Sequence, residues 1–270
     1  LAPSDVVKAV QFFGGVPVFC DVTPDSFCID HRSLENAVRQ VVSVDRLYPR
    51  AVIAENFCGV PFSLRAVKNV CDRMGLILIE DCGNDYGGES DGILCGSVGD
   101  YSIIGLGDST VFRTGGSGCL LTASAGNPLS EHMKSCDLAG YQSADRIYAD
   151  ELINALDALP GRLEENLRVL GEFEKILSES DFWIQRYSGR QKPSGTAAVI
   201  VAPGTEPREA ALQCMSDAGL FGYARKLHAH TKSCFDRCGR GLKNIENATA
   251  IAPRAFAVDI GQAANDGALP

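Results

Sequence analysis

Short apolar runs alternate along the chain with amphipathic segments in which apolar positions recur every three or four residues. Turn residues bound the apolar runs, which have the length of strands, and the segments between them have the length of helices. This alternation is typical of a largely parallel sheet covered by helices. The sequence therefore predicts an α/β fold with a mixed, mostly parallel sheet flanked by helices.

The pattern also gives the bounds of the expected elements. The predicted strands are 16–19, 51–54, 76–80, 101–104, 118–122, 196–201 and 255–259. The predicted helices are 5–13, 31–41, 64–74, 129–137 and 206–218; Ser63 caps the third of these and Gly75 ends it.

A longer helical stretch, 145–179, contains Pro160-Gly161, where we expect a kink or a break because proline has no amide hydrogen to donate. With a boundary near Gly189, the chain divides into a large domain (1–144), a helical connector (145–188) and a small domain (189–270).

Composition excludes several classes of protein. The 270 residues are 45% hydrophobic and 22% charged, an ordinary globular balance. No apolar run reaches the roughly 18 residues that a membrane span needs, and the net charge of −9 offers nothing to nucleic acid, so we expect neither membrane insertion nor a nucleic-acid partner. The eleven cysteines are scattered along the chain, which favours reduced thiols in the cytoplasm or another reducing compartment.

Several motifs resemble those of a known family, in order and spacing, from Leu1 to about Gly140. They are Gly14 to Asp21, Asp25-Ser26-Phe27, Ile29-Asp30, Gly59-Val60-Pro61, Ile79-Glu80-Asp81 with Gly87, Gly96 to Asp100, and Gly118 to Thr122. The chain resembles the sugar-nucleotide aminotransferases of the DegT/StrS type, which are fold-type-I enzymes dependent on pyridoxal 5'-phosphate.

The resemblance implies an incomplete large α/β domain, a smaller C-terminal α+β domain, and a homodimer whose sites share residues across the interface. It also implies pyridoxal phosphate as cofactor and a nucleotide sugar as ligand. The family's chain usually begins earlier, with a segment that carries a phosphate-binding turn. We therefore expect this chain to be a truncated member.

The resemblance can be tested at each cofactor-holding position. Asp81 stands where the family places the carboxylate that pairs with the pyridinium nitrogen, at the carboxyl end of a buried strand, where ligands of α/β sheets bind. Asn84 stands where a polar group lies beside the cofactor ring. Gly105 replaces the phosphate-binding serine and Thr110 replaces the Schiff-base lysine. Glu80 is a companion of the motif, and we expect a structural role for it.

Thr110 decides the functional prediction, because a hydroxyl cannot form an imine. No lysine occurs between Lys68 and Lys134, and no histidine between His31 and His132, so no shift of the alignment restores the amine or the histidine of dehydrating relatives. The sequence predicts a degenerate, non-transaminating homologue that serves as a scaffold, regulatory partner or pseudoenzyme subunit, in a homodimer or with another chain. The alternative is an active enzyme completed by another chain or using a non-covalent cofactor.

One segment carries residue types that bind zinc, namely His228, His230, Cys234 and Cys238. Two histidines two residues apart point to opposite sides of an extended chain, whereas the two cysteines share one helical face. The four would converge only with a turn at 231–233. We therefore keep them as weak candidates and predict no metal site.

Overall fold

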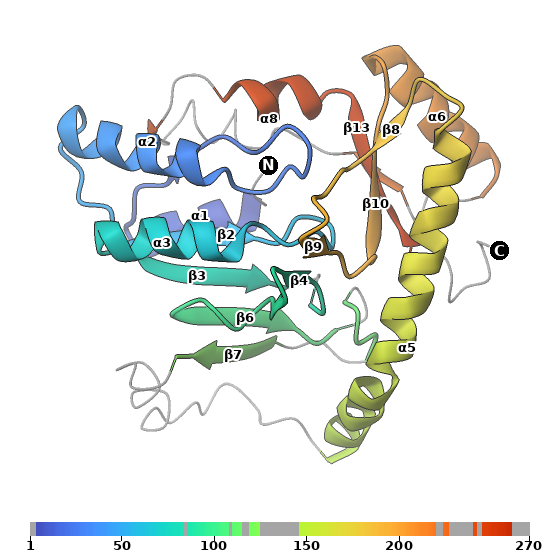
Figure 1. Cartoon of the computed structure of the whole chain (residues 1–270), viewed down its shortest axis with the longest axis horizontal. Coiled ribbons are helices and arrows are strands. Elements are labelled where there is room, and N and C mark those ends of the chain that lie inside the picture. Colours follow the sequence, from blue (N-terminus) through green and yellow to red (C-terminus); the bar gives the residue numbers. More distant parts are fainter. Residues whose placement is uncertain are drawn as a thin grey trace.

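The computed structural model of the protein describes residues 4–83, 86–107, 110–114, 119–124, 146–219, 224–226, 240–241 and 245–260 (Figure 1). The helices are α1 (Ser4–Phe12), α2 (His31–Ser43), α3 (Leu64–Met74), α5 (Arg146–Leu177), α6 (Thr205–Asp217) and α8 (Glu246–Ile251). The longer strands are β2 (Ala51–Glu55), β3 (Ile77–Cys82), β6 (Tyr101–Gly105), β7 (Cys119–Ala123), β10 (Ala197–Val201) and β13 (Ala255–Asp259). The shorter strands are β1 (Val18–Phe19), β4 (Glu89–Ser90), β5 (Ile93–Leu94), β8 (Trp183–Ile184), β9 (Gln191–Lys192), β11 (Ala224–Lys226) and β12 (Arg240–Gly241).

The first large sheet has the strand order β2-β3-β6-β7. The first three strands are parallel, and β7 runs antiparallel to β6, which confirms the expected mixed, mostly parallel sheet. Helices α2 and α3 lie side by side along this sheet (Figure 1). Alternate residues of β3 are buried, Leu78 and Cys82 among them, because successive side chains of a strand point to opposite faces.

The second large sheet is antiparallel, in the order β11-β13-β10-β8, and lies beside the long helix α5 (Figure 1). All five residues of β10 are buried, as expected for a central strand covered on both faces. The predicted strand 255–259 coincides with β13, and the predicted strand 196–201 begins one residue before β10.

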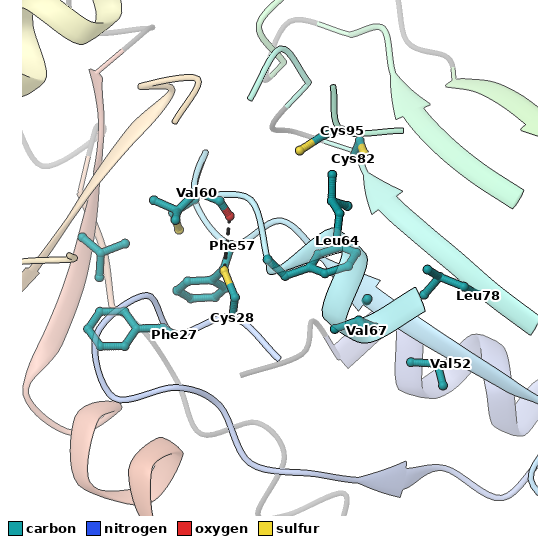
Figure 2. Packing of buried hydrophobic residues seen from close by; sticks show 14 of the residues in the cluster. Phe27, Cys28, Val52, Phe57, Val60, Leu64, Val67, Leu78, Cys82 and Cys95 are labelled. Carbon is teal, nitrogen blue, oxygen red and sulfur yellow. Dashed lines mark hydrogen bonds between the residues drawn. The ribbon is translucent and has the colours of Figure 1, made fainter. Parts of the chain in front are cut away.

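Close contacts join the two large sheets. Strand β9 pairs with β4 of the short hairpin, and the amide of Ser194 donates to the carbonyl of Gly59 at 2.8 Å. Gly59 has a φ of +82°, and a Cβ there would lie 2.7 Å from the Ser194 hydroxyl, so this contact requires glycine. One buried cluster includes residues of both sheets and of the loops between them; Figure 2 shows its Phe27, Phe57 and Cys28, whose thiol donates to the Val60 carbonyl at 3.2 Å.

Of the expected kink or break at Pro160, the break is wrong, because α5 runs through the proline as one 32-residue helix. Leu152, Leu159 and Leu163 pack against the main core on both sides of the proline. This burial outweighs the hydrogen bond that the proline cannot donate. The expected helix 129–137 lies outside the described residues. In the described part of the chain, no helix has the length and apolar character that crossing a bilayer requires.

The substitution Pro160→Ala should raise the free energy of unfolding by about 2 kcal/mol, because alanine restores a donor inside α5 and removes the ring's steric conflict. Urea denaturation followed by circular dichroism measures the change. Pro207→Ala is the matched control, since Pro207 lies in the first turn of α6, where the amide has no partner within the helix. Equal effects of the two substitutions would contradict this interpretation.

Candidate functional site

The candidate site lies at the carboxyl ends of β3 and β6, where neighbouring parallel strands end together. Asp81 is the penultimate residue of β3 and pairs in register with Ile103 of β6. It is half-buried, and its Oδ1 accepts a hydrogen bond from the amide of Gly83 at 2.9 Å. The structure therefore places Asp81 at the sheet edge where ligands of open α/β sheets bind.

The neighbouring carboxylate, Glu80, points to the opposite face of the sheet and is fully buried. Its Oε2 accepts from the amide of Gly96 at 2.8 Å, and its Oε1 accepts from the amides of Val98 and Gly99, the former at 2.6 Å. Backbone donors of this kind compensate a carboxylate for the loss of water. Glu80 thus holds the turn before β6, which agrees with the structural role expected for it.

Gly105 ends β6 directly against the chain that leaves β3. A Cβ at this position would overlap the carbonyl oxygen of Gly83 and would lie 3.0 Å from Cγ2 of Thr110. Backbone atoms cannot yield to such an overlap as the end of a flexible side chain can. The position therefore has no room for the serine that the resemblance places there.

The hydroxyl of Thr110 is used within its own turn. Thr110 is buried, its Oγ1 donates to the carbonyl of Gly107 at 2.6 Å, and the same oxygen accepts from the amide of Phe112 at 3.2 Å. The donor and one acceptor direction of the hydroxyl are thus satisfied by the backbone. Gly105 and Thr110 lie close together, and the hydroxyl of Thr110 is engaged with the carbonyl of Gly107.

Lys68 is the lysine that precedes this segment in the sequence, and its amine is bound by two carboxylates. From α3, its Nζ donates to Asp72 at 2.7 Å and to Asp100 at 3.3 Å. Burial lowers the pKa of this amine, but the hydrogen bonds to the two carboxylates outweigh burial and hold the pKa above its usual value. A protonated, ion-paired amine cannot act as the nucleophile of an imine.

Helix α5 fixes the segment that follows Thr110. Arg162 donates from Nη1 to the carbonyl of Phe112, and Arg113 donates from Nη2 to Oδ1 of Asn166 at 3.3 Å. The ring of Phe112 stacks on that of Tyr86, with centroids 5.6 Å apart. Sequence reasoning missed these contacts, because no local pattern shows which residues of a helix meet a loop some fifty positions earlier.

The other predicted residues cannot be compared with the structure. Asn84, His228, His230, Cys234 and Cys238 lie outside the described residues. Within the described ranges, no three His, Cys, Asp or Glu side chains gather as metal ligands would. Taken together, the described residues keep one carboxylate suited to a pyridine nitrogen, but they do not fit a cofactor held through a lysine imine and a serine at position 105.

The fold is that of fold-type-I aminotransferases. The model of the DegT/DnrJ/EryC1/StrS aminotransferase family matches residues 4–165, and the chain belongs to this family. The solved structure of a DegT/DnrJ/EryC1/StrS aminotransferase from Brucella abortus superimposes with a TM-score of 0.82 at 19% identity, over 96% of this chain and 72% of that one.

Curated relatives are aminotransferases as well. The L-glutamine:2-deoxy-scyllo-inosose aminotransferase of Streptomyces kanamyceticus is 32% identical over 108 residues, which are 40% of this chain and 24% of that protein. The enzyme of the same name from Streptoalloteichus tenebrarius is 31% identical over 159 residues, 59% of this chain and 35% of that protein. The chain therefore spans about a quarter to a third of the length of these relatives. It is a homologue of pyridoxal phosphate-dependent sugar aminotransferases.

We expect Gly105→Ser to lower the free energy of unfolding by about 3 kcal/mol, because the added Cβ overlaps backbone of Gly83 and forces the two strand ends apart. Gly171→Ser is the control: a Cβ at Gly171, in α5, meets nothing within 4 Å, and its effect should stay within about 0.5 kcal/mol. Thermal and urea unfolding measure both. A Gly105→Ser protein as stable as the control would mean that this position has room for the serine.

The substitution Glu80→Ala should lower the free energy of unfolding by about 3 kcal/mol, since it leaves three amides without an acceptor, that of Gly99 buried and those of Gly96 and Val98 partly buried. Glu164→Ala, at an exposed position of α5, should change it by less than about 0.5 kcal/mol. Hydrogen exchange of the amides of Gly96, Val98 and Gly99 locates the effect. Unchanged protection of these amides in the Glu80 variant would contradict the role assigned to it.

Proposed function

We propose that this chain is a catalytically degenerate member of the sugar aminotransferase family, which does not transaminate and acts as a scaffold or regulatory subunit. The observation that supports the proposal is Thr110, a buried hydroxyl engaged with its own turn, at the position where the resemblance implies the Schiff-base lysine. Transamination requires an amine to form the imine and move the proton, and a threonine hydroxyl does neither at neutral pH.

Two further observations support the proposal. Gly105 removes the serine hydroxyl expected to bind phosphate, and the approach of the Gly83 carbonyl leaves no space for its return. Lys68 is held by two carboxylates and so does not replace the missing amine. The proposed losses concern only positions that would hold the cofactor. Glu80 and the glycines at close packing contacts are present. Such a protein would work through assembly, as a homodimer or with another chain.

One observation favours a second candidate function. Asp81 is still at the carboxyl end of β3, half-buried, with one oxygen bound to the Gly83 amide. A carboxylate there could pair with a protonated pyridine nitrogen, and another chain could then complete an active enzyme that uses a non-covalent cofactor. The second candidate requires that pyridoxal phosphate stabilise the protein and that Asp81→Asn abolish this stabilisation.

The first proposal makes a direct prediction about Thr110→Lys. The variant should not transfer an amino group to nucleotide-linked keto sugars, because the phosphate site stays closed when only the amine is restored. The experiment incubates the variant with pyridoxal phosphate, reduces any imine with borohydride and maps labelled lysines by peptide mass spectrometry. The wild-type protein gives the background labelling of surface lysines.

Labelling at position 110 should not exceed that of the most reactive surface lysine. Stoichiometric labelling at position 110, or amino-sugar product from this variant, would overturn the assignment of a degraded cofactor site. Amino-sugar product from the wild-type protein would overturn the proposed function itself.

A further inference from the structure

Two cysteines lie together at the carboxyl end of β3. Cys82 is the last residue of that strand, and Cys95 directly follows β5 in the short hairpin. A Cβ on Gly96, the residue after Cys95, would lie 3.7 Å from Sγ of Cys82, so the segment that carries Cys95 passes close to this sulfur. Figure 2 shows the two side chains next to each other. Both are buried, and both are thiols in this structure.

Tyr86 lies against both cysteines. A Cβ on Gly96 would lie 3.7 Å from Cε2 of the Tyr86 ring, the same distance as from the sulfur of Cys82. Burial raises the pKa of the Tyr86 hydroxyl, and negative charge on Cys82 and on Cys95 raises it further, so both sulfurs are within electrostatic reach of one phenol. The two thiols therefore belong to one small cluster beneath the hairpin.

The sulfur of Cys82 accepts a hydrogen bond from a fixed donor. The buried side chain of Asn56 donates from Nδ2 to Sγ of Cys82 at 3.1 Å, and its Oδ1 accepts from the amide of Phe62 at 3.3 Å. The bond to Phe62 sets which way the Asn56 amide faces, and so it directs the N–H group at the sulfur. A hydrogen bond of this kind favours the thiolate, which is the reactive form of cysteine. Cys71 in α3 is equally buried, and burial raises its pKa to about 11.

We propose that Cys82 and Cys95 are a redox modification site, at which hydrogen peroxide converts the two thiols into a reversible disulfide. The thiolate of Cys82 attacks one peroxide oxygen, the O–O bond breaks, and the departing hydroxide takes up the thiol proton as water, which leaves a sulfenic acid. The sulfur of Cys95 then attacks the sulfur of Cys82, the S–O bond breaks, and hydroxide leaves with the Cys95 proton as a second water. The two sulfurs are oxidised by two electrons in total, and the peroxide is reduced to two waters.

This disulfide would join two segments that Glu80 already holds together. Glu80 lies two residues before Cys82 on the same face of β3, and its Oε2 accepts from the amide of Gly96, the neighbour of Cys95, at 2.8 Å. The hairpin of β4 and β5 also pairs with β9, so the state of the two thiols affects the contact between the large sheets as well as the strand end that carries Asp81. The proposal goes beyond the proposed function and does not depend on it.

The sequence isolates this pair for mass spectrometry. Trypsin leaves residues 74–113 as one peptide, in which Cys82 and Cys95 are the only cysteines. The reduced protein is freed of reductant and treated with hydrogen peroxide, and the remaining thiols are alkylated with N-ethylmaleimide in denaturant. In the disulfide form the peptide takes up no maleimide. Further cleavage before each aspartate gives peptides 81–84 and 91–99, which stay joined until dithiothreitol is added.

We expect peroxide to form this disulfide about tenfold faster than it consumes the thiol of Cys71, because burial without a donor such as Asn56 leaves a thiol inert. The variant Cys71→Ser is the matched control and should form the disulfide at the wild-type rate. In Cys95→Ser, the sulfenic acid of Cys82 should persist and react with dimedone. In Cys82→Ser, dimedone should not label Cys95. Circular dichroism checks that each variant is folded.

Mapping of the wild-type protein is decisive without any variant. Maleimide on both Cys82 and Cys95, at a peroxide dose that oxidises the exposed thiols of Cys119 and Cys214, overturns the proposal. A disulfide that forms only when peroxide is added in denaturant also overturns it, because the reaction would then not belong to the folded protein. Dimedone on Cys95 of the Cys82→Ser variant, with none on Cys82 of the Cys95→Ser variant, overturns the order of the two steps. None of these results bears on transamination, so they leave the proposed function to its own tests.

Discussion

The buried carboxylate of Glu80 is the interaction on which the geometry of the site depends. It lies in the middle strand of the parallel part of the sheet, and it accepts hydrogen bonds from the amides of Gly96, Val98 and Gly99 in the turn before β6. Because these bonds fix where β6 begins relative to β3, they also fix where it ends. Gly105 consequently meets the chain leaving β3 at Gly83, two residues beyond Asp81. The Glu80 carboxylate can be buried at the centre of the sheet because the turn before β6 supplies backbone amides that bind it.

The sequence predicts the regular elements well where the signal is local. Strand β13 has the predicted bounds, and Gly75 ends α3 in the left-handed conformation, as expected of a glycine at this position. Prediction from the sequence fails where contacts between residues far apart in the chain determine the structure. Pro160 is a local helix breaker, yet the leucines around it belong to the core. Strand β4 pairs with β9 so that Glu89 lies opposite Lys192, and no local sequence pattern predicts this pairing.

The same distinction applies to the site. Asp81, Gly105 and Thr110 were predicted from ordered motifs, and the structure places Gly105 close to Thr110, whose Cγ2 would lie 3.0 Å from a Cβ at position 105. The carbonyl of Gly83 was not predicted, because a close approach of two backbones depends on tertiary geometry. The contacts of α5 with the turn after Thr110 have the same origin. Residue types at aligned positions thus give a prediction about the chemistry, and only the packed structure shows what fills the space.

Several of the motif residues that carry the family resemblance hold the scaffold of this chain together. Gly59 lies in one of the motifs that carry the resemblance, and it serves the packing of a loop against Ser194. Glu80 and Asp100 also lie in these motifs, and both stabilise the sheet. Asp100 accepts a hydrogen bond from the amide of Leu78 at 2.8 Å and forms an ion pair with Lys68. A match over residues 4–165 therefore reports that the scaffold is kept. It does not report on the side chain at position 110.

Positions 105 and 110 are also physically coupled. A Cβ at Gly105 would lie 3.0 Å from Cγ2 of Thr110, so a change at either position alters the space at the other, and their energetic effects should not add. A lysine at position 110 would have to leave the closed turn that the threonine hydroxyl now makes, and a serine at position 105 would have to displace the Gly83 backbone. Because that backbone follows Asp81 by only two residues, a serine at position 105 would require the chain that leaves β3 just after Asp81 to move.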